Sequence, residues 1–219
     1  MALKQKDAVN GYVKLNYGKS IVDGICNMIY NYYTIKMESI ILNNNEQYLL
    51  IISLLDQFTK NGIKYIDTEL LFRASDNKYS SRAFHKICNE QSNTIVIIHT
   101  ETDHVFGGFT SQPWPSKEFA RIVDENALLF SIRPKLEFFK SRRNHVKPTI
   151  AKHGPLIGPI FGDGWDLYID NTSNGKDCHG ASTPTTFAFN GKEVLGVDFD
   201  PSYQYHFIVV DYEVFTPGF

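Results

Sequence analysis

Two apolar segments separated by four polar residues constrain the fold of this chain more than any other feature. The first, residues 94–99, is rich in β-branched side chains, and the second spans residues 104–109. The polar residues 100–103 between them have the length of a hairpin loop. Because both segments are apolar on both faces, we expect this hairpin to lie inside a sheet rather than at its edge.

Other segments extend the same pattern. Phe and Tyr are abundant, with 16 and 12 copies, and aromatic side chains favour half-buried pleated surfaces. Further strands are expected at residues 70–73, 127–132, 136–139, 165–169 and 205–215. Short strands separated by Gly and Pro turns predict an α+β protein that is mainly β, with a two-sheet antiparallel β-sandwich flanked by short α-helices.

Two helices are expected. An apolar stripe at a helical period follows Asn44 and Asn45, either of which could cap the helix, and Asn61-Gly62 ends it. Ser80 is expected to cap a second helix that carries Phe84 and Cys88 on one face. Residues 1–37 are expected to form an N-terminal leader, whose periodicity does not decide its structure, and residues 38–219 a single domain.

The cysteine content argues against several classes of protein. Cys26, Cys88 and Cys178 are odd in number, far apart and form no CxxC pair, so neither a disulfide framework nor a structural zinc site is expected. The polar N-terminus has no signal-peptide pattern, and no run of about 18 apolar residues predicts a membrane span. We therefore expect a cytoplasmic protein that needs no cofactor.

The basic residues have an uneven distribution. The formal net charge is −2, yet no acid occurs between Phe138 and Gly162, while the rest of the chain has 17 basic and 24 acidic residues. Such a segment could meet an acidic protein face, a phosphate-rich lipid surface or RNA, or could simply be a solvated loop. The candidate binding residues are Lys140, Arg142, Arg143, Lys147 and Lys152.

Glu213 is the most interesting acidic position. Alternation along the last strand places Tyr212 and Val214 on one face, and Glu213 on the other with Asp211 and Phe215. An inward carboxylate needs a partner. Glu213 could therefore be a structural carboxylate, part of a partner surface, or a catalytic group in a pocket.

Two histidine-containing sites are further candidates. Cys178 next to His179 is the best redox candidate, because an imidazolium could lower the pKa of the thiol. His99 and His104 flank the polar turn of the hairpin and could share a metal ion with a carboxylate from that turn. The simpler interpretation is that both imidazoles are solvated.

Several blocks of the sequence together resemble the TLDc domain family. They occur in the family's order at plausible spacing across residues 69–215, and the helix expected before them also matches. The blocks are ELLFRAS (69–75) with SSRAFHKIC (80–88), HVFGGFTS (104–111) with Trp114, ALLFSI (127–132), FGDGWDLYI (161–169) and YEVF (212–215). One departure is Asn77-Lys78, where the family usually has Asp-Gly; lysine lacks glycine's freedom at positive φ, so a turn of different shape is expected.

The resemblance implies a β-sandwich with short helices, a link to oxidative-stress resistance and, for several members, binding to the vacuolar proton-pumping ATPase. It brings no agreed catalytic mechanism. The family-motif residues that we expect to be structural are Gly107, Gly108, Gly162, Asp166 and Glu213.

Three functions follow from these observations. The first is a non-catalytic interaction module linked to oxidative-stress resistance, with a cytosolic complex such as the vacuolar ATPase as its partner. The second is a weak redox or hydrolytic enzyme that uses Cys178 with His179, or Glu213. The third is a nucleic-acid-binding protein that uses the basic segment 140–152.

Overall fold

The computed structural model describes part of the chain and divides it into two compact units. One unit is residues 1–69 with 217–219, and the other is residues 70–216. The division expected at residue 37 concerns a different boundary and stays a prediction. The described residues are 4–9, 12–16, 35–58, 66–141, 149–152, 156–163, 165–171, 178–182, 186–187, 189–201 and 205–218.

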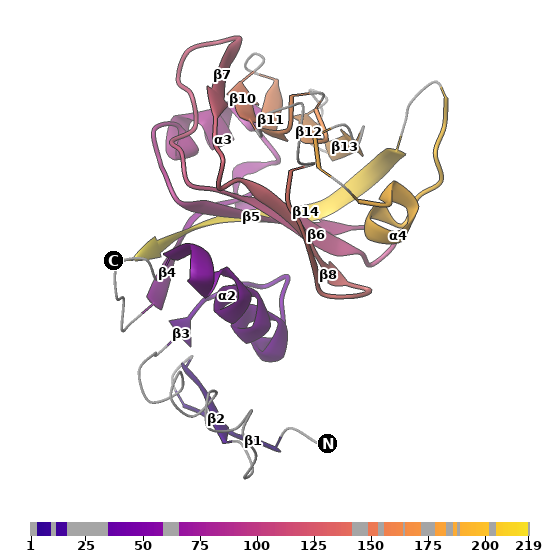
Figure 1. The fold of residues 1–219 in the computed structure, drawn as a ribbon. Coiled ribbons are helices and arrows are strands. Elements are labelled where there is room, and N and C mark those ends of the chain that lie inside the picture. The colour runs from indigo at the N-terminus through magenta and orange to yellow at the C-terminus, as the bar shows by residue number, and fades with distance from the viewer. Residues whose placement is uncertain are drawn as a thin grey trace. The chain divides into compact units, whose positions relative to one another are not determined.

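In its described part, the first unit contains short strands and helix α2 (Asn44–Phe58) (Figure 1). Strands β1 (Lys4–Val9) and β2 (Tyr12–Asn16) pair antiparallel, and β3 (Ile35–Lys36) pairs parallel with the start of β4 (Ile66–Arg73). Helix α2 (Asn44–Phe58) follows β3.

The cap of α2 lies one residue earlier than expected. The side chain of Asn43, rather than that of Asn44 or Asn45, accepts from the backbone N–H of Asn45 at 3.0 Å and of Glu46 at 3.1 Å. Glu46 in turn accepts from the backbone N–H of Asn43 at 2.9 Å, which completes a capping box. None of the described helices is both long and apolar enough to cross a bilayer.

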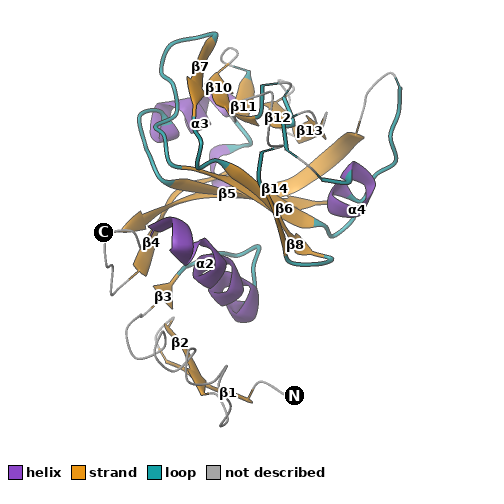
Figure 2. Cartoon of the chain, in the orientation of Figure 1, coloured by secondary structure: helices purple, strands orange, loops and turns teal. Residues whose placement is uncertain are grey.

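The second unit is the predicted sandwich, with two antiparallel sheets that share strand β14 (Tyr205–Gly218) (Figure 2). In one sheet the strand order is β14, β5 (Thr94–Thr100), β6 (Val105–Thr110), β8 (Leu128–Arg133) and β9 (Glu137–Phe139), and β4 also pairs with β14. In the other it is β7 (Ala120–Val123), β10 (Thr149–Lys152), β11 (Ile157–Phe161), β12 (Leu167–Asn171), β13 (Cys178–Ser182) and β14.

The predicted hairpin is confirmed as β5 and β6. Val96 pairs with Gly108 and His99 with Val105, and the turn lies between them as expected. Both strands are interior, since β5 lies between β14 and β6, and β6 lies between β5 and β8. Apart from half-buried His99, every residue of the two strands is buried.

In the described part of the second unit, two short α-helices accompany the sandwich. Ser80 caps α3 (Ser81–Cys88) as predicted, because its hydroxyl accepts from the N–H of Ala83 at 3.2 Å. Helix α4 (Gly191–Leu195) was not expected from the sequence. Before α3, Lys78 has φ 53° and ψ 34°, so this lysine adopts the left-handed conformation that glycine favours.

The two sheets pack face to face at Gly108. A β-carbon on Gly108 would lie 2.7 Å from the ring of Phe161, which belongs to the other sheet. A β-carbon on Gly107 would overlap the backbone carbonyl oxygen of Val96 and lie 2.9 Å from the ring of Phe130. These two glycines therefore allow close approach of one strand to its neighbour and of one sheet to the other.

This packing predicts a coupling between Gly108 and Phe161. Gly108→Ala should destabilise the fold by about 1–3 kcal/mol, because the added methyl group must displace the Phe161 ring. Combining it with Phe161→Leu should cost less than the sum of the two single changes, since the smaller side chain frees the space. Urea denaturation of the wild type, the two single variants and the double variant measures the coupling. Strictly additive effects would contradict the contact between Gly108 and Phe161.

Candidate functional site

Glu213 on β14 binds Arg73 at the end of β4. The Glu213 side chain is fully buried, and one of its oxygens, Oε1, accepts from both Nε and Nη2 of Arg73 at 2.8 Å. Burial lowers the pKa of Arg73, but the hydrogen bond and charge of Glu213, together with those of Asp76, raise the pKa above its ordinary value. The pair thus joins two residues that are 140 positions apart in the sequence.

Asp211, two residues earlier, binds the segment that follows β4. Its carboxylate accepts from the backbone N–H of Ser75 at 3.0 Å and from the Ser75 hydroxyl at 2.7 Å. It also accepts from the N–H of Tyr212 at 2.8 Å. The acidic face of β14 therefore fastens the end of β4 and the short 3-10 turn Ser75–Asn77 to the sandwich.

Gly162 and Asp166 act together at a second loop. Gly162 has φ +87°, and a β-carbon there would overlap the Asp166 carboxylate. Asp166 is fully buried and accepts from the backbone N–H groups of Thr186 at 2.6 Å and Phe187 at 2.8 Å. The glycine gives the carboxylate room, and the carboxylate holds a segment twenty residues further along the chain.

Sequence reasoning missed a fourth buried carboxylate, Asp124. It accepts from the hydroxyl groups of Thr110 and Ser111, both at 2.7 Å, and from the backbone N–H of Ser111 at 2.6 Å. It also accepts from the N–H of Asn126 two residues on, at 3.0 Å. An Asp followed by a polar turn is typical of this local pattern, so the sequence did contain a signal.

His85 was not among the predicted site residues, although Ser75, Ser80 and Ser81 lie near it in the sequence. It lies on α3 between Ser81 and Asn89, which share its helix face at a spacing of four residues. Nε2 lies 2.8 Å from the carbonyl oxygen of Ile157, and Nδ1 lies 3.0 Å from Oδ1 of Asn89. Because a carbonyl oxygen can only accept, Nε2 carries a proton, and in this arrangement it is not a base for a serine hydroxyl.

His99 and His104 bind different groups. His99 Nε2 lies 3.0 Å from Asp103, which also forms an ion pair with Arg133. His104 Nδ1 lies 3.0 Å from the carbonyl oxygen of Thr102. Within the part of the chain that the structure describes, no three His, Cys, Asp or Glu side chains form a group that could hold a metal ion.

The other predicted site residues are only partly described. Lys140 is exposed just after β9, whereas Arg142, Arg143 and Lys147 lie outside the described residues. Lys152 lies on β10 opposite Ala120, and Cys178 and His179 lie on β13 opposite Asn171 and Asp170. The side chains of Lys152, Cys178 and His179 also lie outside the described residues.

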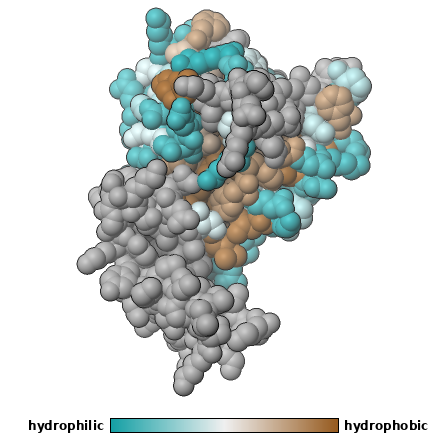
Figure 3. All heavy atoms as spheres, viewed as in Figure 1, coloured by the Kyte–Doolittle hydropathy of each residue, from teal (hydrophilic) through white to brown (hydrophobic). Residues whose placement is uncertain are grey.

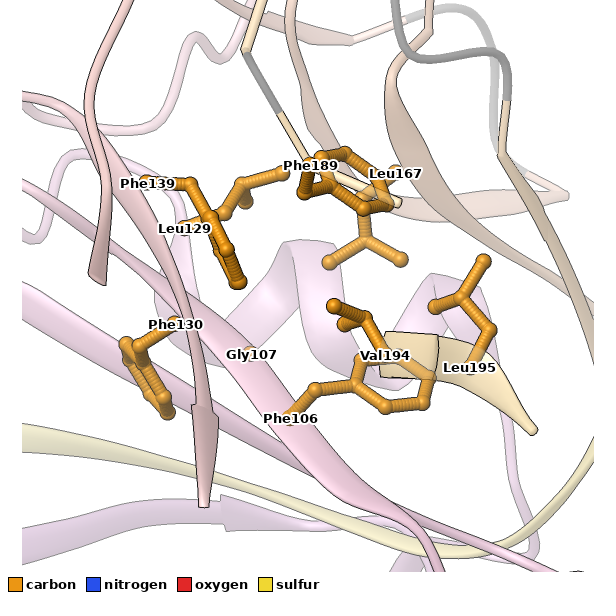
Figure 4. Close-up of a pocket in the computed structure, with 9 residues that line it drawn as sticks. All are labelled: Phe106, Gly107, Leu129, Phe130, Phe139, Leu167, Phe189, Val194 and Leu195. Carbon is orange, nitrogen blue, oxygen red and sulfur yellow. The ribbon is translucent and has the colours of Figure 1, made fainter. Parts of the chain in front are cut away.

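The cavity drawn in Figure 4 is hydrophobic. It lies between β6, β8 and β9 on one side and β12 and α4 on the other, so it belongs to the interior of the sandwich. Among the described residues, its walls offer no acid, base, nucleophile or metal ligand. They are formed by Phe106, Gly107, Leu129, Phe130, Phe139, Leu167, Phe189, Val194 and Leu195.

The buried ion pair predicts unequal effects of its two partners. Arg73→Ala should destabilise the fold by about 3–5 kcal/mol, because it leaves the Glu213 charge buried without its guanidinium. Arg73→Ala combined with Glu213→Leu should recover much of this loss, since no buried charge remains. Chemical denaturation measures both, and a double variant less stable than Arg73→Ala alone would contradict the assignment.

Cys88 is predicted to be inert in the folded protein. Burial raises the pKa of its thiol to about 12, so at pH 8 almost no thiolate is present to react. A raised pKa stabilises the fold below the ordinary value near 9, and this contribution is lost as the pH rises from 9 toward 12. Iodoacetamide labelling at pH 8, followed by peptide mass spectrometry, should modify Cys88 only in denaturant. Equal labelling rates in native and denatured protein would contradict its burial.

A comparison with models of known protein families identifies the family of this chain. The model of the TLDc domain matches residues 35–218, nearly the whole chain. A search of the curated proteins finds no match. The family model covers both the Gly107–Gly108 and Gly162–Asp166 packing elements and the acidic face of β14, and this chain therefore belongs to the TLDc domain family.

Proposed function

We propose that this protein is a non-catalytic interaction module, linked to oxidative-stress resistance, that binds the vacuolar proton-pumping ATPase. Membership of the TLDc family supports the link to oxidative stress. The proposal that the module is non-catalytic rests on one observation, which is that its buried acidic side chains serve as structural anchors. Asp124, Asp166, Asp211 and Glu213 each bind backbone or side-chain donors that hold loops and strands in place.

The described surface also offers contact area for a protein partner. In the view of Figure 3, hydrophobic residues lie near the middle of the described surface, with hydrophilic residues to their right. On and beside β7, which ends the strand order of its sheet, Phe119 is 70% exposed and Val123 is 49% exposed. Large exposed apolar side chains of this kind are typical anchors of protein interfaces.

A binding experiment tests the proposal directly. The purified protein should bind purified vacuolar proton-pumping ATPase saturably in biolayer interferometry. Phe119→Asp tests the β7 surface, and charge reversal of Lys140, Arg142, Arg143 and Lys147 tests the basic segment. Ser92 is exposed, so Ser92→Ala serves as a control that should bind like the wild type. Absence of binding by the folded wild-type protein would reject this partner.

The enzyme alternative has its own test. Peroxide consumption by the purified protein should be negligible and unchanged by Cys178→Ser or by Glu213→Gln. If the rate exceeds that of buffer alone and falls in Cys178→Ser, the protein is a redox enzyme rather than a non-catalytic interaction module. Binding of single-stranded RNA that disappears on charge reversal of the basic segment would favour the nucleic-acid alternative.

A further inference from the structure

Three oxygen atoms from three different elements converge beside Gly158 in the second unit. A β-carbon built on Gly158 would lie 3.5 Å from the carbonyl oxygen of Ile169, 3.5 Å from the hydroxyl of Tyr212 and 3.7 Å from the hydroxyl of Ser81. Gly158 lies on β11, Ser81 on α3, Ile169 on β12 and Tyr212 on β14. The nearest neighbours of this point are all hydrogen-bonding atoms, although it lies in the interior.

Solvent does not reach these groups from outside. Ser81 is 2% exposed, Ile169 is 1% exposed and Tyr212 is fully buried. Among the residues that the structure describes, the Ser81 hydroxyl has no hydrogen-bond partner. In native proteins a buried hydroxyl nearly always has a partner, and an ordered water is the usual one where no protein group is available.

The backbone explains why space exists at this point. The pairing of β11 with β12 shifts in register between Ile157 and Ile160, which is the mark of a β-bulge. Pro159 within the bulge has no N–H and cannot donate to β12. Glycine at position 158 adds no side chain, so a small polar gap remains between α3, β11, β12 and β14.

We infer that this gap is the binding site of one buried water molecule. The water donates a hydrogen bond to the Ile169 carbonyl and bonds to the hydroxyls of Ser81 and Tyr212, each of which can donate or accept. Three partners are the usual number for a buried water. Together with the contact between His85 and the Ile157 carbonyl, 2.8 Å long, the water ties α3 to the sheet. This inference does not depend on the proposed function.

Substitution of Gly158 tests this inference, because the melting temperature should fall if a water is bound and rise if the site is dry. A β-carbon here makes only ordinary van der Waals contacts, and Gly158 has no positive φ, so alanine fits both the space and the backbone. If a water occupies the site, Gly158→Ala displaces it, leaves Ser81 without a partner and lowers the melting temperature by roughly 2–6 °C. If the site is dry, the same change raises the melting temperature, because alanine restricts the unfolded chain.

Ser81→Ala provides the second arm, and its effect on the wild type does not depend on whether Gly158→Ala folds. With the water present, Ser81→Ala lowers the melting temperature of the wild type but has little effect in the Gly158→Ala background. Without it, removal of an unpaired buried hydroxyl is neutral or stabilising in both. Ser92→Ala, an exposed change of the same chemistry, controls for the substitution itself.

A crystal structure of the wild type at a resolution that shows ordered waters completes the test. We expect a peak about 2.7–3.2 Å from both the Ser81 hydroxyl and the Ile169 carbonyl oxygen. No peak there, or a higher melting temperature for both single variants, overturns the inference.

Discussion

Glu213 carries a charge into the interior of the sandwich, and the arrangement of the fold depends on how that charge is bound. Moving a carboxylate out of water costs several kcal/mol, which only a close and well-aligned partner offsets. Arg73 supplies that partner from β4, with two nitrogens on one carboxylate oxygen. Since β14 pairs with β13 in one sheet and with β5 in the other, fixing β4 to β14 ties an early segment of the chain to the strand that both sheets share.

The other buried carboxylates apply the same principle to loops. Asp211, Asp124 and Asp166 each accept backbone N–H groups from a loop. Short strands leave long connections, whose backbone groups need partners once they are buried. A side-chain carboxylate can accept several of these N–H groups at once. In this fold, a buried acid is therefore better explained as an anchor for a loop than as a catalytic group.

The sequence could predict those parts of the fold whose signals come from residues close together in the chain. The hairpin of β5 and β6 was predictable because its strands and turn are contiguous, and Ser80 was predictable as a cap because capping involves residues three apart. Three consecutive asparagines made the cap of α2 uncertain by one residue, and Asn43 proved to be the cap. By contrast, the sequence did not predict β7, β10, β11 or β13. These strands are only four or five residues long, and β11 contains both Gly158 and Pro159.

The candidate site was less predictable for the same reason. Strand alternation placed Asp211 and Glu213 on one face, but their partners Arg73 and Ser75 lie more than 130 residues away and carry no local mark. The glycine motifs were visible as a family resemblance, whereas their cause, the Phe161 ring above Gly108 and the carboxylate beside Gly162, needed the second sheet and the loop in place.

Anchored loops also bear on how such a module could bind without catalytic groups. The loop before β7 is fixed by buried Trp114, whose indole N–H donates to Thr94 at 2.8 Å, and by Ser116, whose hydroxyl donates to Glu90 at 2.7 Å. It ends at Phe119, which has φ 59° and a largely exposed ring. An aromatic side chain on a backbone that is already fixed loses little conformational entropy on binding. Rigidity gained from buried polar anchors can therefore serve recognition at the surface.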